Sequence, residues 1–155
     1  MNNSNLDAID RKILKALQQN ARLSMLDLSE KVGLSPTPCA RRIKNLETSG
    51  LILGYRAELD DAQLGYGFSV FVSVQLDKQV DNALHAFEEA IGQYPEVADC
   101  WLMTGNRDYL MRIAVADLPG FEAFLTKKLT KIPSVASIES SVPIRRVKSQ
   151  LALGD

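Results

Sequence analysis

The sequence predicts an α+β protein in two parts, with helices alone in the first third and strands alternating with helices in the remainder. Apolar residues recur at helical spacing up to residue 50, and from residue 68 they alternate as in strands. Charge changes as well: residues 1–56 contain nine Lys and Arg against five Asp and Glu, whereas residues 57–155 contain nine against fourteen. A basic part joined to an acidic part is therefore expected.

The first part begins with two short helices. Asp7 can cap a helix that runs to about Asn20, because its carboxylate can accept from the free amides of the first turn. Ser24 followed by Asp27 is typical of the start of a second helix. Gly33 then predicts a turn into the next segment.

The third helix is expected within residues 35–50. Ser35 is a suitable N-cap whose hydroxyl can accept from the first turn, and Pro36 suits the first helical position. Gly50 suits the left-handed position beyond the helix end. Pro38 disfavours a helical conformation at Thr37, so a tight or irregular first turn is expected.

Projection at about 100° per residue gives this helix an apolar side and a cationic side. The apolar side holds Cys39, Ala40, Ile43 and Leu46. The opposite side holds Thr37, Arg41, Lys44 and Thr48, with Asn45 beside them. Two helices separated by a glycine turn form a helix-turn-helix motif, whose second helix enters the major groove of DNA.

Double-stranded DNA is the partner that this cationic side predicts, because phosphate contact and guanine recognition both need cations. The residues expected to contact base edges are Thr37, Arg41 and Lys44. The residues expected to contact phosphate oxygens are Arg22, Ser35, Arg42 and Asn45. The alternative is a charged helix face that is merely solvated.

A wing and a linker are expected next. Residues 51–59 alternate as LILGYRAEL and predict a strand beside the helices, so that residues 1–59 form a winged helix-turn-helix domain. Residues 60–67, DDAQLGYG, have the composition of a turn and predict a linker. Residues 68–155 then form a second domain.

The second domain follows the order β-α-β-β-α-β. Strands are expected at residues 68–76, 97–104, 108–116 and 135–147, and helices at residues 81–94 and from Asp117 or Pro119. Gly105-Asn106-Arg107 predicts a tight hairpin between the middle strands. This order is the ferredoxin-like arrangement, a four-stranded antiparallel sheet with both helices on one face. The uncovered face predicts a homodimer.

Other function classes find little support. No apolar run is long enough to span a bilayer, and the polar start lacks the apolar core of a signal peptide, so a cytoplasmic protein without membrane contact is expected. Cys39 and Cys100 lack metal-ligand spacing and are interpreted as small buried hydrophobes. His85 is expected at the surface, and Trp101 and Met103 in the core or a dimer interface. No catalytic pair, metal site or cofactor is expected.

Two blocks of sequence resemble the Lrp/AsnC family of transcriptional regulators. VGLSPTPCARRIKNLETSGLI, residues 32–52, is similar to its recognition-helix block, and LMTGNRDYLMRI, residues 102–113, to its effector-domain hairpin. One departure is Ala40, where many relatives carry a bulkier apolar residue. The resemblance implies a regulator that binds DNA as dimers or higher assemblies, often octamers, and responds to a small molecule, commonly an amino acid.

The candidate effector residues of the hairpin are Thr104, Gly105, Asn106, Arg107, Asp108 and Tyr109. Free amides of the turn can receive an α-carboxylate, and the Asp108 carboxylate can pair with an α-ammonium. The resemblance places the site between subunits, where Ser137, Glu139 or Ser140 of a neighbour can complete it. The alternative is a plain hairpin in which Asp108 caps the turn and Tyr109 packs in the core.

Two other functions remain open at this stage. An architectural DNA-binding protein would share the helix-turn-helix but would not respond to an effector. A small ferredoxin-like enzyme would use the N-terminal helices for assembly and would need a catalytic pair near the hairpin, which the sequence does not contain.

Overall fold

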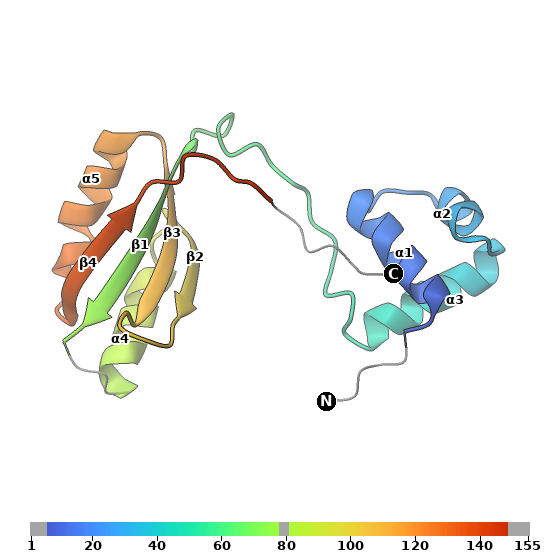
Figure 1. The fold of residues 1–155 in the computed structure, drawn as a ribbon, viewed down its shortest axis with the longest axis horizontal. Coiled ribbons are helices and arrows are strands. Elements are labelled where there is room, and N and C mark those ends of the chain that lie inside the picture. The colour runs from blue at the N-terminus through green and yellow to red at the C-terminus, as the bar shows by residue number, and fades with distance from the viewer. Residues whose placement is uncertain (1–5, 78–80, 149–155) are drawn as a thin grey trace. The chain divides into compact units, whose positions relative to one another are not determined.

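The computed structural model describes residues 6–77 and 81–148 (Figure 1). The chain divides between Glu58 and Leu59 into two compact units, which we call unit 1 and unit 2. Unit 1 contains helices α1–α3, and unit 2 contains the four strands with helices α4 and α5, so the predicted α+β class is confirmed. The division falls at the start of the segment in which the sequence predicts a linker.

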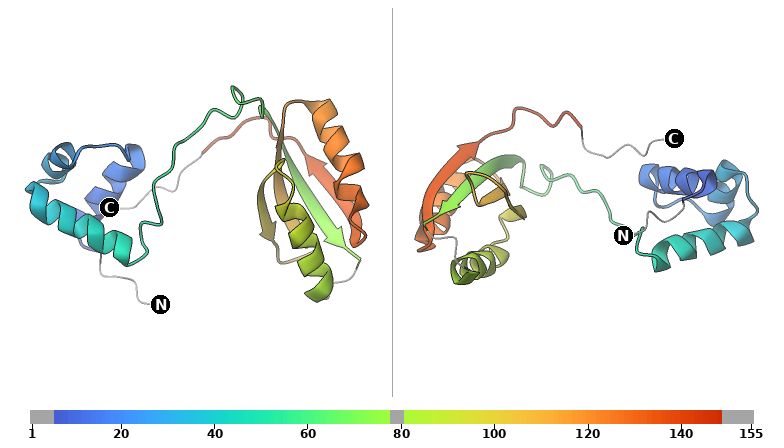
Figure 2. Two further views of the ribbon diagram at one scale, coloured as in Figure 1. Left: turned by 180° about the vertical axis from the view of Figure 1, so that it is seen from behind. Right: turned by 60° about the horizontal axis from the view of Figure 1, so that its bottom comes forward.

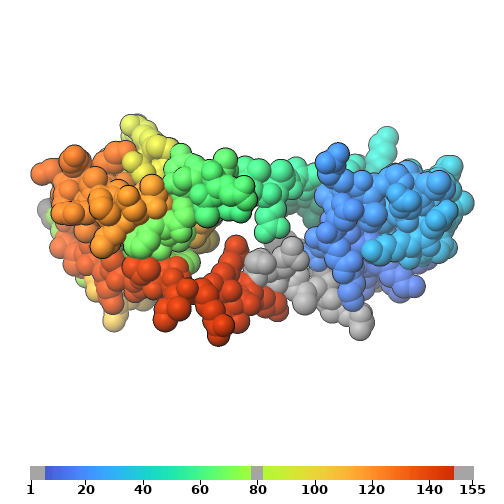
Figure 3. Space-filling view, turned by 90° about the horizontal axis from the view of Figure 1, so that it is seen from above, coloured from blue at the N-terminus to red at the C-terminus, as the bar shows by residue number. Residues whose placement is uncertain are grey.

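Unit 1 consists of α1 (Ala8–Gln19), α2 (Met25–Val32) and α3 (Pro36–Thr48). Asp7 and Ser24 cap the first two helices through their side chains, as predicted. In the space-filling view the three helices, coloured blue to cyan, form one continuous body (Figure 3). Their shared core consists of Ile13, Ala16, Leu28, Val32, Cys39, Ile43 and Leu46.

The start of α3 differs from the prediction in two details. Ser35 occupies the N-cap position, but its side chain makes no capping hydrogen bond. Pro38 does not disturb the helix, which is regular from Pro36 onward. The first amides of any helix lack an intrahelical partner, so a proline in the first turn removes no hydrogen bond. Gly50 adopts the predicted left-handed conformation, with a φ of 75°.

The expected wing strand is absent, because residues 51–59 form no strand. A strand needs a partner for its backbone groups, and no described segment pairs with this one. Ile52 packs against the core of unit 1, but Leu53 is 94% exposed. The Tyr55 hydroxyl donates to a carboxylate oxygen of Glu47 at 2.9 Å, which ties the segment to the end of α3.

Unit 2 is a four-stranded sheet in the order β2-β3-β1-β4, in which every pair is antiparallel. Both helices lie on one face of the sheet, as the view from behind shows (Figure 2). The predicted ferredoxin-like arrangement is therefore confirmed. The elements are β1 (Phe68–Leu76), α4 (Asp81–Gly92), β2 (Val97–Leu102), β3 (Tyr109–Val115), α5 (Leu118–Lys127) and β4 (Val135–Ser141).

Two boundaries in unit 2 differ from the sequence prediction. The last strand ends at Ser141 rather than at residue 147. Pro143 follows closely and has no amide hydrogen to donate to a ladder, so the strand cannot continue through it. The connection between β2 and β3 spans residues 103–108 and is wider than the tight hairpin expected.

The two faces of the sheet have different environments. Val70, Val72 and Val74 of β1 are fully buried against the helices. Alternate residues of the strands point to the opposite face, which we call the open face because no helix covers it. Trp101 and Met103 are 45% and 42% exposed, so they are not core residues of a single chain.

The two cysteines also differ. Cys39 is buried in unit 1, as predicted. Cys100 is exposed, contrary to the prediction, because it lies on β2 at the edge of the sheet. His85 is exposed on α4, as expected.

Candidate functional site

The cationic side of α3 is exposed as the sequence predicts. Thr37, Arg41 and Lys44 all lie at the surface, opposite the buried Cys39 and Ile43. Within residues 6–77 and 81–148, neither Arg41 nor Lys44 makes an ion pair. Unpaired cations on a regular helix are available for phosphates or guanine edges without the loss of an internal contact.

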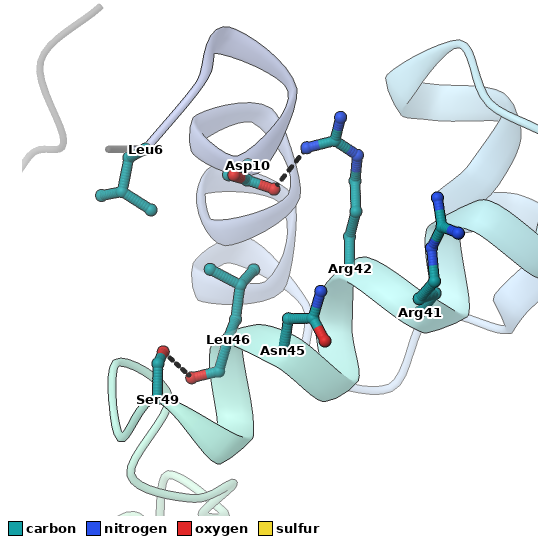
Figure 4. Close-up of a pocket in the computed structure, with 7 residues that line it drawn as sticks. All are labelled: Leu6, Asp10, Arg41, Arg42, Asn45, Leu46 and Ser49. Carbon is teal, nitrogen blue, oxygen red and sulfur yellow. Dashed lines mark hydrogen bonds and ion pairs between the residues drawn. The ribbon is translucent and has the colours of Figure 1, made fainter. Parts of the chain in front are cut away.

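Arg42 is placed differently from its neighbour. Its Nη1 donates to Asp7 Oδ2 at 2.6 Å and to Asp10 Oδ1 at 2.9 Å, which joins α3 to the N-terminus of α1. Figure 4 shows Arg42 reaching Asp10 while Arg41 extends without such a partner. The amide of Asp10 and the Arg42 guanidinium lower the pKa of the Asp7 carboxyl, and the same ion pairs raise the pKa of Arg42.

The predicted phosphate contact by Arg42 therefore finds no support in the geometry. A guanidinium that already satisfies two carboxylates would have to give up charge-assisted hydrogen bonds in order to reach DNA. Arg42 and the two aspartates form what we call the Arg42 clamp. Its structural effect is to fix α3 against α1.

The other expected phosphate contacts are accessible. Arg22 is exposed in the connection between α1 and α2, and Ser35 is exposed at the start of α3. Asn45 is also exposed and lines a pocket of about 410 Å³ together with Arg41 and Arg42 (Figure 4). Polar groups at a helix start and along its rim suit backbone contact, which positions a protein on DNA without reading its sequence.

A second candidate site is formed by the β2–β3 loop. Thr104, Gly105 and Asn106 are exposed, and the φ of Gly105 is 111°, a value that favours glycine. These residues line an open pocket of about 420 Å³. Ser73, Met103 and Leu110 also line this pocket but were missed in the sequence. The alternation along β1 places Ser73 on the open face, but only the strand order shows that it adjoins the loop.

Asp108 and Tyr109 have structural partners. The Asp108 side chain is buried, and its Oδ2 accepts from the amide of Leu76 at 2.7 Å. Tyr109 lies in the core against Phe87, with ring centroids 4.5 Å apart, and its hydroxyl donates to Glu88 at 2.8 Å. These contacts match the plain-hairpin alternative for these two residues.

Arg107 connects the loop to β4 within one chain. Its Nη1 donates to the Ser137 hydroxyl at 2.5 Å, and its Nη2 donates to Glu139 at 2.9 Å. Ser137 and Glu139 lie on the open face, opposite Gln75 and Ser73 of β1. Ser140 pairs with the buried Val72 and so points to the other face, which separates it from this site.

Other kinds of site are not found among the described residues. No group of three or more His, Cys, Asp or Glu side chains is placed to hold a metal ion in that part of the chain. No helix in the same ranges is long and apolar enough to cross a membrane.

The comparisons with known proteins agree with both sites. A sequence model of the Lrp/AsnC ligand binding domain matches residues 69–153, which is more than half of the chain. The chain belongs to the Lrp/AsnC family. A model of a winged helix-turn-helix DNA-binding domain matches residues 6–52. The Lrp/AsnC chain therefore carries a winged helix-turn-helix domain of this class, although residues 51–59 form no strand.

Several relatives are similar over nearly their whole length. The Bkd operon transcriptional regulator of Pseudomonas aeruginosa is 50% identical over 142 residues, covering 92% of this chain and 93% of the relative. The leucine-responsive regulatory protein of Rhizobium meliloti is 39% identical and covers 92% of each. A crystal structure of a transcriptional regulator from Neisseria meningitidis in complex with L-Met matches with a TM-score of 0.89 and 35% identity, over 96% of each chain.

These findings establish the function class. The relatives are transcriptional regulators, and this Lrp/AsnC chain is a DNA-binding transcriptional regulator of the same type.

Proposed function

We propose that this Lrp/AsnC regulator reads specific duplex DNA with α3, and that an amino acid bound at the β2–β3 loop changes its DNA binding or assembly. The observation that carries the DNA half is the pair of exposed, unpaired cations Arg41 and Lys44 on one face of α3. In this proposal Thr37, Arg41 and Lys44 contact base edges, each good bidentate pair supplying about 1–3 kcal/mol of discrimination. Arg22, Ser35 and Asn45 contact phosphates.

The effector half rests on the charges around the loop. The exposed loop amides and the Arg107 guanidinium can receive an α-carboxylate, while Glu139 can pair with an α-ammonium. Both charges of an amino-acid zwitterion then have a partner. Asp108 and Tyr109 are assigned a supporting role, because their buried contacts hold the loop in place. The complex of the Neisseria meningitidis relative with L-Met favours an amino acid as the ligand class.

The open face of the sheet supports an assembly. Phe71, Trp101 and Leu110 lie on this face, and Trp101 is half exposed. A second subunit would remove such apolar surface from water. We propose a homodimer as the basic unit, with higher assemblies such as an octamer built from it. A cytoplasmic location and the absence of catalytic activity are part of the same proposal.

The test is fluorescence anisotropy with DNA that flanks the protein's own gene, at several salt concentrations and with each amino acid in turn. Wild-type protein should bind this DNA in preference to random duplex, and at least one amino acid should change the affinity or the assembled mass. Arg41→Ala should lose the preference, whereas Lys12→Ala, which removes an exposed cation from α1, should keep it. Equal binding to both duplexes by the wild type would contradict the proposal.

An architectural DNA-binding protein is distinguished by the same experiment. Salt-sensitive binding that no amino acid alters would favour this alternative.

A further inference from the structure

Unit 2 contains a second pocket that the proposed function does not use. It has a volume of about 480 Å³ and lies between the turn before β1, the end of β3 and α5. It shares no lining residue with the loop pocket. The loop and this turn lie at opposite ends of β3, which for seven residues is roughly 20 Å (Figure 1).

The walls of this pocket are mostly apolar. Ala114 and Ala123 are small and leave room between the strand and α5. Leu64, Tyr66 and Phe124 provide large apolar surfaces, and Leu64 and Tyr66 are exposed. An apolar group of a ligand would remove this surface from water, which is favourable in proportion to the area covered.

A polar group in the pocket lacks a partner. Glu96 lines the pocket, and its Oε1 accepts from Lys128 Nζ at 2.6 Å. Its Oε2 is buried without a hydrogen-bond partner among the described residues. Burial raises the pKa of Glu96, but the hydrogen bond from Lys128 outweighs this and leaves the pKa below its ordinary value. A buried carboxylate oxygen without a donor is costly, so a ligand donor would be favoured here.

A cation completes the site. Lys127 lines the same pocket, is exposed, and makes no ion pair with any residue that the structure describes. We infer that this pocket binds an amino acid with an apolar side chain, whose α-ammonium donates to Glu96 Oε2 and whose α-carboxylate pairs with Lys127. The ligand side chain would lie against Phe124 and Tyr66. This site is separate from the loop site and gives each chain two amino-acid sites.

The test is isothermal titration calorimetry of the full chain with L-leucine, L-methionine and L-phenylalanine, compared in three variants. Ala123→Leu fills the pocket, and Glu96→Gln removes its negative charge. Glu89→Gln, at an exposed position of α4, is the control for loss of one carboxylate. Wild type and Glu89→Gln should bind two molecules per chain, and the other two variants should keep one site while the second weakens at least tenfold. Melting temperatures without ligand identify any variant that fails to fold.

The outcomes separate this inference from the loop site. A single site per chain that both pocket variants leave intact would overturn the inference and leave the loop proposal standing. A single site that Glu96→Gln weakens but Gly105→Val does not would support the pocket and contradict the loop proposal. A change in oligomeric mass with Ala123→Leu, without any change in titration, would identify the occupant as a second copy of the chain and overturn the inference.

Discussion

Asp108 offers the sharpest test of how the β2–β3 loop is built. Its buried Oδ2 accepts from the amide of Leu76 at 2.7 Å, across the boundary between the loop and β1. Asp108→Ala removes this acceptor and leaves a buried amide unpaired. Asp108→Asn removes the negative charge but keeps an oxygen in nearly the same position. The pair of variants separates hydrogen bonding from charge.

The size of the effect follows from the buried amide. Leu76 is only 4% exposed, so water cannot readily replace the lost acceptor. An unsatisfied buried donor costs about 1–3 kcal/mol. In a unit of about 90 residues, each kcal/mol shifts the melting temperature by roughly 4–8 °C. Asp108→Ala should therefore lower the melting temperature of unit 2 by roughly 4–24 °C, and Asp108→Asn by clearly less.

Differential scanning calorimetry measures these shifts, and amino-acid titration of the same samples measures ligand binding. We expect Asp108→Asn to fold and to keep most of its affinity, because the carboxylate serves the loop rather than the ligand. Wild-type stability in Asp108→Ala would refute the structural role. Loss of amino-acid binding in a fully stable Asp108→Asn would show that the carboxylate contacts the ligand.

Three further predictions concern unit 1. Arg41→Ala should cost about 1–3 kcal/mol on cognate DNA and much less on random duplex, measured by anisotropy; equal losses on both would contradict base contact. Arg42→Ala should lower the melting temperature of unit 1 yet retain the choice of sequence, and an unchanged melting temperature would argue against the clamp. The lowered pKa of Asp7 predicts stability that is present above its ordinary value of 3.8 and is lost as the pH falls through the folded-state pKa. Asp7→Asn, which keeps a helix cap, should lack this acid-sensitive part in thermal scans.

Much of the fold could be predicted because local signals agreed with the tertiary structure. The first strand of unit 2 matches the prediction at both ends, since its alternation is bounded by turn residues. The same pattern in residues 51–59 led to an error, because alternation shows which residues suit a strand and not whether a partner strand exists. At β4 the pattern continued past Pro143, and the missing amide hydrogen explains the early end.

The candidate sites were predicted by residue type and corrected by contacts far apart in sequence. Arg107 meets Ser137 and Glu139 about thirty residues later, in the same chain rather than only in a neighbour. The register of β4 separates these two residues from Ser140, which a one-residue step turns to the other face. No pattern within the loop itself contains this information.

Arg41 and Arg42 show how the structure alters the electrostatics of unit 1. Both are arginines on one helix, but one step of about 100° turns Arg42 toward the N-terminus of α1. There it neutralises Asp7 and Asp10, two carboxylates that border the pocket beside Arg41 and Asn45. Without Arg42 these carboxylates would repel an approaching phosphate backbone. Arg42 can therefore favour DNA binding without touching DNA, by removing negative charge from the edge of the surface that Arg41 and Lys44 make positive.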